Sequence, residues 1–431
     1  MKAICYPSRL SGKVRAIPSK SDAHRKLICA ALSDNGCILP LSEPFCDDIA
    51  ATVRCLRALG SEITQTDGGL RVSPLEKQKH AVLDCGESGS TLRFLLPVAM
   101  AVCEDIAVTG TGRLPERPIG ALAEAMSAHG VQFSRSSLPL TAAGRLTGGA
   151  YEIAGNISSQ FLSGLLIALP LCEADSEIRL TTPLQSSAYV DMTLDTLRLF
   201  GADIRVSADK SGLLRYQIMH GALHAPDAVS IDGDWSNAAF WLTAGAIQKD
   251  ADSAVTVSGL DGHSTQGDRD IVPILQSAGA LIAKNSDEFT AVSGMCRHVD
   301  TEMQEIPDLL PILAVRAAYA KPADACSNFV KAERLRLKES DRLTATAKLL
   351  RDLGGKVDEH PDGLSVYGGQ LHGGTVDGMN DHRLVMAAAI AAICADSPVT
   401  ILGAEAVRKS YPHFFDDYQA LGGKCRFTED D

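Results

Sequence analysis

The sequence predicts an α/β protein built from six repeats of about 70 residues. The first observation is a pattern that recurs along the chain, in which an amphipathic helix end is followed by a glycine and an apolar strand start. Glycine suits the left-handed cap that ends a helix, so we expect each of these glycines to pass the chain from a helix to a strand. They lie 68 to 78 residues apart and are Gly60, Gly130, Gly201, Gly279, Gly354 and Gly422.

A second series of helices, out of phase with the first, is predicted by apolar segments that open with polar residues. Helices that are apolar on nearly every face must be enclosed by other elements, whereas the amphipathic helices of the first series can line a surface. Each repeat is therefore expected to hold one buried helix and one surface helix. The apolar segments begin near residues 21, 88, 158, 235, 307 and 381.

The length of 431 residues favours two domains of three repeats over a single ring, because one hydrophobic core rarely serves so long a chain. The longest apolar run covers residues 384–395. It is shorter than the roughly 18 to 20 residues that span a bilayer, so we interpret it as a buried helix.

Composition limits the class of partner. The formal charge of −12 disfavours nucleic acids and anionic membranes, which attract basic surfaces. The 12 cysteines include no CxxC pair, and neither Cys nor His shows metal-ligand spacing, so we expect reduced thiols and no metal or other cofactor. The first residues lack an apolar leader, and we expect a cytoplasmic protein and, by default, a monomer.

Ionisable residues gather near the predicted helix starts, and many of them are cations. Lys and Arg there oppose the positive end of the helix dipole and call for a compensating anion. We infer a cleft for small substrates that carry phosphate and carboxylate groups, although solvated surface charge is the alternative for any single residue. The cations are Lys20, Arg93, Arg117, Lys338, Arg342, Arg383 and Lys409.

Two common nucleotide-binding signatures are absent from the sequence. Neither a GxxxxGK(S/T) loop nor a strand-linked GxGxxG occurs, so neither an ATPase loop nor a dinucleotide fold is supported. Residue types alone therefore leave the reaction unnamed.

Ten motifs, spread from residue 18 to residue 415, resemble those of the EPSP (5-enolpyruvylshikimate-3-phosphate) synthase family and follow the same order. In the first half they are PSKSDAHR (18–25), CGESGSTLRF (85–94), LPERPIG (114–120), SSQFLSGLL (158–166) and SSAYVDMTLDTL (186–197). In the second half they are DGDWSNAAFWL (232–242), IPDLLPILA (306–314), RLRLKESDRL (334–343), DHRLVMAAAIAA (381–392) and RKSYPHFF (408–415). KESDR and DHR together are the most specific of these signals.

The resemblance implies the two-domain enolpyruvyl transferase fold, an inside-out α/β barrel with three repeats in each domain. Domain one would comprise residues 1–18 and 234–431, and domain two residues 21–231. The chain would cross between them near residues 18–21 and 231–234, and the domains would close around the substrate before catalysis.

The resemblance also implies the substrates, shikimate 3-phosphate and phosphoenolpyruvate, and the residues that hold them. The positions that match the shikimate 3-phosphate site are Lys20, Ser21, Arg25, Ser158, Ser159, Gln160, Ser186, Asp308 and Lys338. The positions that match the phosphoenolpyruvate site are Lys20, Gly89, Arg117, Gln160, Arg342, Arg383 and Lys409.

The implied reaction is addition followed by elimination, which needs an acid and a base. The matches assign Glu339 as the proton donor and later acceptor at the methylene carbon of phosphoenolpyruvate. They assign Asp308 as the base that takes the proton of the 5-hydroxyl, and Lys20 as the group that stabilises or protonates the departing phosphate. Glu339 is also expected in the first turn of a helix, where it would favour the dipole.

Some positions depart from the family pattern or carry no assigned role. Arg334 stands where some members have Asn near the sugar phosphate, Glu87 stands where some have Asn, and His382 is either a ligand contact or a helix-start hydrogen bonder. Gly89 keeps the smallest side chain beside the expected phosphoenolpyruvate pocket, which predicts sensitivity to the analogue inhibitor glyphosate.

Three alternative functions are weighed against this one. The sister transferase that acts on UDP-N-acetylglucosamine typically has Lys-Asn where this chain has Lys20-Ser21, and a reactive cysteine ahead of an Arg-Pro where this chain has none. A more distant RNA 3′-terminal phosphate cyclase would favour a basic surface. A non-catalytic anion-binding homologue is disfavoured because the chain retains all four of the residues Lys20, Asp308, Glu339 and Lys409.

Overall fold

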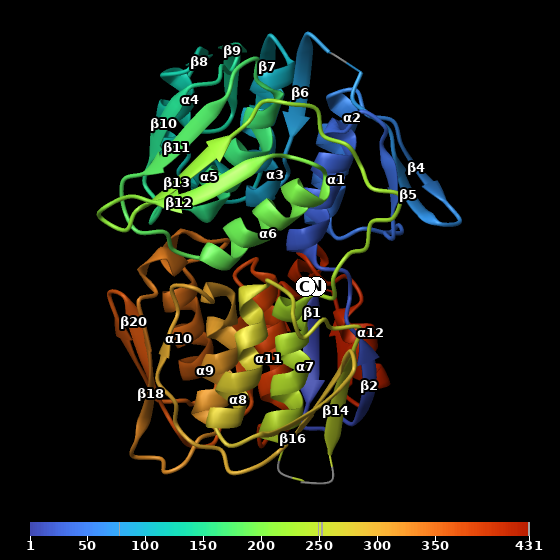
Figure 1. Cartoon of the computed structure of the whole chain (residues 1–431). Helices are drawn as coiled ribbons and strands as arrows, with labels where there is room; N and C mark the ends of the chain where they lie inside the picture. The colour runs from blue at the N-terminus through green and yellow to red at the C-terminus, as the bar shows by residue number, and fades with distance from the viewer. Residues whose placement is uncertain (77, 249, 251–252, 430–431) are drawn as a thin grey trace. The chain divides into compact units, whose positions relative to one another are not determined.

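The computed structural model describes residues 1–76, 78–248, 250 and 253–429. Contacts divide the chain into two compact units, which are labelled by element in Figure 1. Unit 1 comprises Met1–Ser19 and Asp232–Asp431, and unit 2 comprises Lys20–Ile231. The chain therefore leaves unit 1 after Ser19 and re-enters it at Asp232.

The strands of the described residues form six small sheets, three in each unit. Unit 2 holds the orders β3-β5-β4, β6-β7-β9-β8 and β10-β11-β13-β12, and unit 1 holds β15-β16-β14-β2, β17-β18-β20-β19 and β21-β22-β1-β23. The four-stranded sheets share one topology, in which a parallel strand pair continues into an antiparallel hairpin-like pair. One sheet for each repeat agrees with the predicted sixfold repetition.

The strands are short. Those of unit 2 are β3 (Cys37–Leu39), β4 (Ile63–Thr66), β5 (Gly69–Val72), β6 (His80–Asp84), β7 (Asp105–Thr109), β8 (Val131–Phe133), β9 (Leu140–Gly144), β10 (Ala150–Ile153), β11 (Ser176–Leu180), β12 (Ile204–Ala208) and β13 (Leu214–Ile218). Those of unit 1 are β1 (Lys2–Tyr6), β2 (Gly12–Arg15), β14 (Ala254–Ser258), β15 (Leu281–Asn285), β16 (Glu288–Val292), β17 (Thr301–Glu302), β18 (Cys326–Val330), β19 (Val357–His360), β20 (Gly363–Tyr367), β21 (Gly374–Asp377), β22 (Val399–Leu402) and β23 (Lys424–Thr428).

The N-terminal segment completes two repeats of unit 1 that the rest of the chain leaves short of a strand. Strand β1 inserts antiparallel between β22 and β23, with Lys2 opposite both Leu402 and Thr428. Strand β2 forms the parallel edge beside β14, with Val14 opposite Val257. The first 15 residues are thus part of the second half's fold, which fixes the two chain ends in one sheet.

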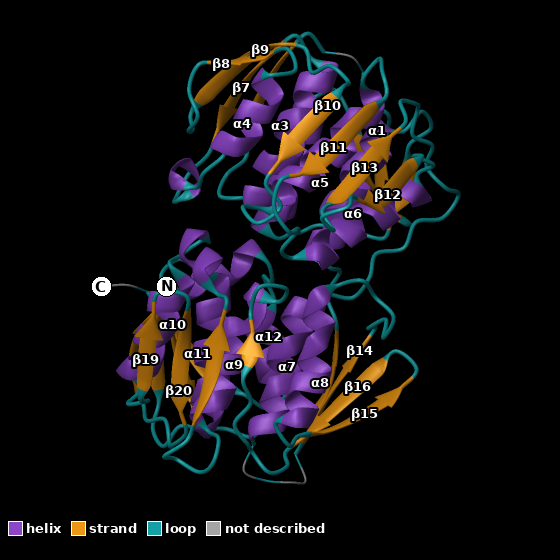
Figure 2. Cartoon of the chain, turned by 60° about the vertical axis from the view of Figure 1, so that its left-hand side comes forward, coloured by secondary structure: helices purple, strands orange, loops and turns teal. Residues whose placement is uncertain are grey.

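The predicted division into buried and surface helices is confirmed, because one helix in each repeat is buried on nearly every face and the other on only one side. The enclosed helices are α1 (Lys20–Leu32), α3 (Gly89–Val102), α5 (Ser159–Ala168), α7 (Trp235–Ile247), α9 (Leu310–Ala318) and α11 (His382–Cys394). The surface helices are α2 (Asp47–Ala58), α4 (Gly120–Ser127), α6 (Ser187–Leu199), α8 (Ile271–Ser277), α10 (Arg342–Asp352) and α12 (Phe414–Ala420). Figure 2 shows the sheets at the outside of each unit, with helices inside them.

The six repeat glycines have the predicted conformation. Their φ angles lie between +76° and +100°, in the region that side chains other than hydrogen disfavour. Each follows a surface helix closely, so it reverses the chain from that helix toward the next strand.

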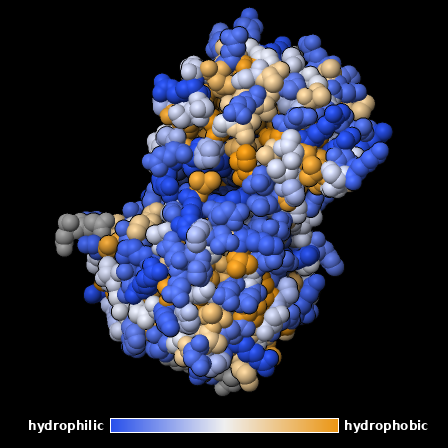
Figure 3. Space-filling view, turned by 90° about the vertical axis from the view of Figure 1, so that its left-hand side faces the viewer, coloured by the Kyte–Doolittle hydropathy of each residue, from blue (hydrophilic) through white to orange (hydrophobic). Residues whose placement is uncertain are grey.

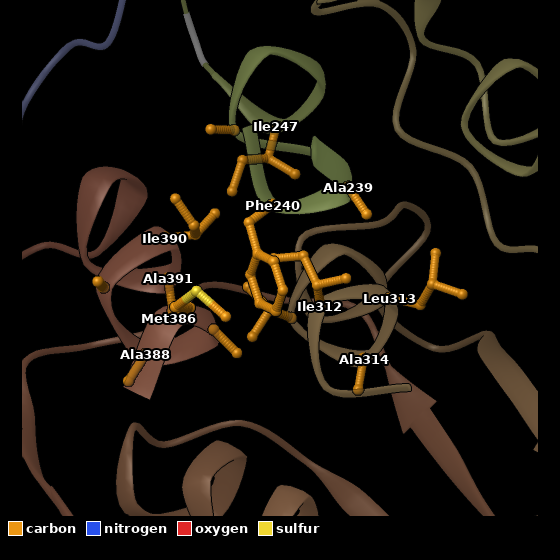
Figure 4. Packing of buried hydrophobic residues seen from close by; sticks show 14 of the residues in the cluster. Ala239, Phe240, Ile247, Ile312, Leu313, Ala314, Met386, Ala388, Ile390 and Ala391 are labelled. Atoms are coloured by element: carbon orange, nitrogen blue, oxygen red, sulfur yellow. The ribbon is translucent and has the colours of Figure 1, made fainter. Parts of the chain in front are cut away.

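Aliphatic side chains fill the core of each unit. In unit 1, Phe240 of α7 points among Met386 and Ile390 of α11 and Ile312 of α9 (Figure 4). All 13 residues of α11 are buried, as its apolar sequence predicts. In unit 2, α3 and α5 approach so closely that a Cβ on Gly164 would overlap the carbonyl oxygen of the facing α3 backbone.

Hydrophilic side chains predominate on the face drawn in Figure 3, where hydrophobic ones are scattered. In the ranges described, no helix combines the length and hydropathy needed to cross a membrane.

Candidate active site

A buried arginine in unit 1 joins three carboxylates. Arg342, the first residue of α10, has a side chain that is only 1% exposed. Its Nη1 donates to Asp308 at 2.6 Å, its Nη2 to Glu339 at 2.6 Å, and its Nε to Asp381 at 2.8 Å. A single guanidinium therefore holds the two carboxylates assigned as base and acid, together with a third that lies deeper in the fold.

The negative charges of the three carboxylates keep Arg342 protonated. Burial alone would lower the pKa of Arg342, but the carboxylates of Asp381, Glu339 and Asp308 outweigh burial and raise its pKa well above the ordinary value. Arg342 therefore stays charged. Charge-assisted hydrogen bonds of this kind are short and orient both partners, so the carboxylates are preorganised.

Two further cations face the carboxylate of Asp308. Arg383 Nη2 donates to Asp308 Oδ2 at 2.9 Å, and Lys338 Nζ lies 3.4 Å from Asp308 Oδ1. Partial burial lowers the pKa of Lys338, and Asp308 opposes that shift. Lys409 Nζ donates to the carbonyl oxygen of Asn380, just before the α11 segment that carries Arg383.

The two aspartates Asp381 and Asp308 lie at or just ahead of the starts of helices. Asp381 is the N-cap of α11, where its Oδ1 accepts from the backbone N–H of Arg383 at 3.0 Å. Asp308 lies in the 3₁₀ helix η4 (Pro307–Leu309), directly ahead of α9. Because the first N–H groups of a helix have no partner within it, capping carboxylates and anionic ligands both gain stability at such ends.

The segment that carries Lys338 and Glu339 is anchored by Arg336, which lies in the 3₁₀ helix η5 (Glu333–Leu337). Its guanidinium donates to Asp341 at 3.0 Å and to Glu359 at 3.0 Å, and it also donates to two backbone carbonyls of the β19–β20 turn. The loop between η5 and α10 is therefore tied to a sheet.

In unit 2, hydrogen bonds join polar side chains of α3 and α5. Arg93 Nη1 donates to Gln160 Oε1 at 2.6 Å, and Gln160 Nε2 donates to Ser90 Oγ at 2.9 Å. Ser158 is the N-cap of α5, and its Oγ accepts from the backbone N–H of Gln160 at 3.3 Å. Ser159 is the first residue of α5, so several candidate substrate contacts cluster at one helix start.

Gly89 and Arg117 are in contact within unit 2. A Cβ built on Gly89 would lie 2.6 Å from Nη1 of Arg117, so only hydrogen at this position leaves room for the guanidinium. Lys20 begins α1, and its Nζ donates to Asp48 Oδ2 at 2.6 Å. Arg117 and Lys20 are both largely buried, and burial strengthens the field of a cation.

A chain of buried hydrogen bonds links α1, α2 and the start of α3. His24 Nδ1 and Thr52, Thr52 and Thr91, and Thr91 and Ser88 lie 2.7 Å apart in each pair. Burial and two nearby cations lower the pKa of His24 well below its usual range, so the imidazole is neutral at neutral pH.

Arg25 joins α1 to α6. Its Nε donates to Thr193 at 2.8 Å, and its two Nη atoms donate to the carbonyl oxygens of Ser21 and Tyr189. Ser186 is the N-cap of α6 and has φ 56° and ψ 47°, a left-handed conformation that costs free energy in a residue with a Cβ. Such local strain is characteristic of functional sites.

Several predicted placements at helix starts are wrong. Lys409 ends the 3₁₀ helix η6 (Ala404–Lys409), where a cation agrees with the dipole rather than opposing it. Glu339 precedes the N-cap Asp341 of α10 and is therefore not in the first turn. Arg93 and Arg117 also depart from helix starts: Arg93 is the fifth residue of α3, and Arg117 caps the C-terminus of η1 (Leu114–Glu116).

Carboxylates compensate several of the cations that were predicted to need an anion. The partner Asp48 was not singled out in the sequence, and Asp381 was noted only as part of a motif and not as a partner of Arg342. Asp381 stands beside His382 and Arg383 in the DHR motif, which is the signal that could have found it. Asp48 has no such signal, because it meets Lys20 from 28 residues away. Across the described ranges, no three His, Cys, Asp or Glu side chains are grouped as metal ligands would be.

Comparison with known proteins identifies the family. The profile of EPSP synthase (3-phosphoshikimate 1-carboxyvinyltransferase) matches residues 4–418. A 3-phosphoshikimate 1-carboxyvinyltransferase of Clostridium kluyveri is 40% identical over 425 residues, which cover 97% of this chain and 96% of that protein. The chain belongs to the EPSP synthase family. A member from Methanocorpusculum labreanum is 36% identical over 99% of this chain and 100% of its own length.

Solved structures of EPSP synthases and of another enolpyruvyl transferase share the fold. EPSP synthase from Acinetobacter baumannii superposes with a TM-score of 0.79 at 22% identity, covering 99% of this chain and 100% of that one. The enolpyruvyl transferase NikO from Streptomyces tendae gives a TM-score of 0.74 at 19% identity, covering 99% and 98%. The predicted EPSP synthase fold is thereby confirmed, and as a member of this family the chain is a 3-phosphoshikimate 1-carboxyvinyltransferase.

Proposed function

We propose that the site residues named above carry out the family's reaction, in which the enolpyruvyl group of phosphoenolpyruvate passes to the 5-hydroxyl of shikimate 3-phosphate and phosphate is released. The observation that carries the proposal is the link through Arg342, whose guanidinium holds Asp308 at 2.6 Å and Glu339 at 2.6 Å. Addition followed by elimination needs one acid and one base at fixed positions, and this contact supplies two preorganised carboxyl groups.

In the addition step, Glu339 gives its proton to the methylene carbon of phosphoenolpyruvate, and Asp308 takes the proton of the 5-hydroxyl. The hydroxyl oxygen then bonds to the cationic carbon that protonation creates. Arg342 and Lys338 adjoin these carboxylates and stabilise the negative charge of the substrates.

In the elimination step, the Glu339 carboxylate takes one proton from the new methyl group while the carbon–oxygen bond to phosphate breaks. The double bond re-forms, and phosphate leaves with the negative charge. Lys20 stabilises or protonates the departing phosphate. The partial burial of the Lys20 side chain in unit 2 supports this role.

The substrate contacts follow the family positions. For shikimate 3-phosphate we propose Lys20, Ser21, Arg25, Ser158, Ser159, Gln160, Ser186, Asp308 and Lys338, and for phosphoenolpyruvate Lys20, Gly89, Arg117, Gln160, Arg342, Arg383 and Lys409. Buried cations in both sets, such as Arg25 and Arg342, support the binding of two anions that otherwise repel each other.

We further propose that residues 18–21 and 231–234 act as the hinge of a domain closure. Within unit 1 the two segments pair, since the Ser19 N–H donates to the Asp232 carbonyl at 2.7 Å and Pro18 bridges Gly233. Two adjacent connections can bend together, which supports a hinge. A cytoplasmic, monomeric enzyme remains our proposal for the working state.

The test is phosphate release from phosphoenolpyruvate by the purified chain, with shikimate 3-phosphate, UDP-N-acetylglucosamine or no acceptor. Release that requires shikimate 3-phosphate supports the proposal. Release only with the nucleotide sugar would assign the chain to the sister activity, and release with neither would indicate a non-catalytic homologue. Asp308→Asn serves as the matched variant, because it keeps the side-chain shape and removes the base.

A further inference from the structure

Two adjacent segments of unit 1 carry the chain out of the unit and back into it. The leaving segment is residues 16–19, and the entering segment is residues 232–235. They pair in the antiparallel sense, with a single bridge between Pro18 and Gly233. Because two paired strands are only marginally stable on their own, other groups must hold these segments together if they are to bend as one.

The side chain of Gln266 forms hydrogen bonds with both segments. Its Oε1 accepts from Ser19 Oγ of the leaving segment and from the backbone N–H of Trp235 in the entering segment, both at 3.1 Å. Its Nε2 donates to the Gly233 carbonyl at 2.9 Å and to Ser264 Oγ at 3.2 Å. The amide therefore makes all four hydrogen bonds that a glutamine side chain can make.

The partners of the Gln266 amide also determine its orientation. The Trp235 N–H can only donate and the Gly233 carbonyl can only accept, so the oxygen and nitrogen of the amide cannot exchange places. Gln266 is the N-cap residue of the 3₁₀ helix η3 (Gly267–Asp270), but its side chain makes no hydrogen bond to that helix end. Its side chain therefore joins distant segments instead of capping its own helix.

The hydrogen bonds of Gln266 are buried. Only 6% of Gln266 is exposed, and Ser19 and Trp235 are buried as well. A Cβ on Gly233 would lie 2.1 Å from the carbonyl oxygen of Gly259, so the entering segment packs directly against the backbone beside it. Because buried donors and acceptors cannot turn to water, losing a partner at this site is costly, and the two segments stay joined.

Ser264 extends the same connection to the first residue of the entering segment. Its Oγ donates to Asp232 Oδ2 at 2.9 Å and accepts from the backbone N–H of Gln266 at 3.3 Å. The carbonyl of Asp232 in turn accepts from the Ser19 N–H at 2.7 Å. Both segments are thus held up to their last residue in unit 1, which leaves bending to the residues directly beyond Ser19 and directly before Asp232.

We propose that Gln266 is a positioning residue for domain closure, and that its amide joins the leaving and entering segments so that they bend as a single hinge. The inference rests on the proposed function, because it takes residues 18–21 and 231–234 to be that hinge. Gln266 acts only through the segments that it joins. Two connections that bend separately would allow the units more relative orientations, so closure would cost more conformational entropy.

Two substitutions weaken the connection to different degrees. Ser19→Ala removes one hydrogen bond and keeps the backbone pairing, whereas Gln266→Met keeps the length of the side chain and removes all four. Both substrates depend on the same closure, so a costlier closure should raise both KM values by the same factor. We expect about fivefold for Ser19→Ala, the usual contribution of one hydrogen bond, with kcat nearly unchanged at saturation.

The experiment is steady-state kinetics of phosphate release with each substrate varied in turn, together with urea denaturation of every variant. The matched controls are Ser277→Ala and Gln276→Met, the same substitutions at exposed positions of α8, and both should leave the KM values unchanged. A merely structural role of the Ser19 hydroxyl would lower the denaturation midpoint without changing either KM, and a substrate contact would raise only one KM. Either result for Ser19→Ala would overturn the inference.

The double variant tests whether the Ser19 hydroxyl acts through the Gln266 amide. If it does, adding Ser19→Ala to Gln266→Met should change neither KM further, because the bond is already lost. Fivefold effects that multiply in the double variant would contradict the inference. Should Gln266→Met not fold, Ser19→Ala alone decides, since it leaves three of the four Gln266 bonds in place.

Small-angle X-ray scattering during a titration with shikimate 3-phosphate separates this inference from the proposed function. We expect the radius of gyration of the wild type to fall on binding, and Ser19→Ala to need about five times more ligand for the same fall. A wild type that does not become more compact would remove the proposed closure and the inference with it. Equal titration midpoints for the wild type and Ser19→Ala would leave the closure standing and overturn only the role of Gln266.

Discussion

The guanidinium of Arg117 occupies the space that a side chain on Gly89 would need, because a Cβ there would lie 2.6 Å from Nη1 and 2.9 Å from Cζ. Gly89→Ala should therefore displace the guanidinium rather than the backbone. We expect KM for phosphoenolpyruvate to rise about tenfold, equivalent to about 1.4 kcal/mol, with a much smaller change for shikimate 3-phosphate. Steady-state kinetics with each substrate varied in turn would check this.

Gly120→Ala is the control for this substitution. Gly120 begins α4, and a Cβ on it meets nothing within 4 Å, so KM should not change. Inhibition by the phosphoenolpyruvate analogue glyphosate should weaken in Gly89→Ala alone. An unchanged KM and unchanged inhibition in Gly89→Ala would remove Gly89 and Arg117 from the substrate site.

Substitutions of Ser186 can separate the effect of its backbone strain on stability from the effect of its hydroxyl on substrate binding. Its φ of 56° is costly for serine and alanine but not for glycine. Ser186→Gly should raise the free energy of unfolding by about 1 kcal/mol, whereas Ser186→Ala should not. Both variants lose the hydroxyl, so both should raise KM for shikimate 3-phosphate by the same factor. Urea denaturation and kinetics on the two variants would test this, and a KM that rises only in one variant would contradict a hydroxyl contact.

Glu339→Gln removes the proposed acid and keeps its shape. Arg342 retains Asp308 and Asp381 as partners, so the fold should persist. We expect kcat to fall by about 10² to 10⁴, the usual contribution of general acid–base catalysis, while both substrates still bind. Calorimetric titration with shikimate 3-phosphate would establish binding, and turnover within a few-fold of the wild type would exclude Glu339 as the acid.

Burial of Asp268 and the charge of Asp308 raise the pKa of Asp268, which predicts a dependence of stability on pH. Its folded pKa of about 7 lies above the ordinary value of 3.8. The stability contributed by the protonated carboxyl is thus fully present below pH 3.8 and is lost as pH rises through about 7. Asparagine has no such proton, so Asp268→Asn should gain stability over the wild type by about 2 kcal/mol between about pH 5 and about pH 8. Denaturation curves at both pH values would check the sign. The control is Asp270→Asn, the same substitution at an exposed position two residues away.

The features predicted correctly from the sequence depend on local physics. Gly60 and its five counterparts adopt positive φ because a helix end that turns into a strand needs that conformation, whatever packs around it. The apolar segment at 384–395 was correctly predicted to be buried for the same reason, since its residues leave no polar face.

The features that were missed depend on distant contacts. Lys20 meets Asp48 across 28 residues, and Arg342 meets Asp381 across 39. The pairing of β1 with β23 joins opposite ends of the chain. No local pattern encodes such pairings, so the cations were visible in the sequence and several of their carboxylate partners were not. Lys409 was misplaced because the short 3₁₀ helix that it ends has no periodic signal.

Protonation of the methylene carbon by Glu339 can be observed directly in D₂O. Addition converts that carbon to a methyl group that carries one solvent-derived deuteron, and elimination then removes any one of its three hydrogens. The measurement is the proton NMR spectrum of the product formed in D₂O by the wild type and by Glu339→Gln. We predict deuterium in the vinyl group of the wild-type product, with exchange and turnover lost together in Glu339→Gln. A product whose vinyl group keeps both original protons would contradict addition followed by elimination.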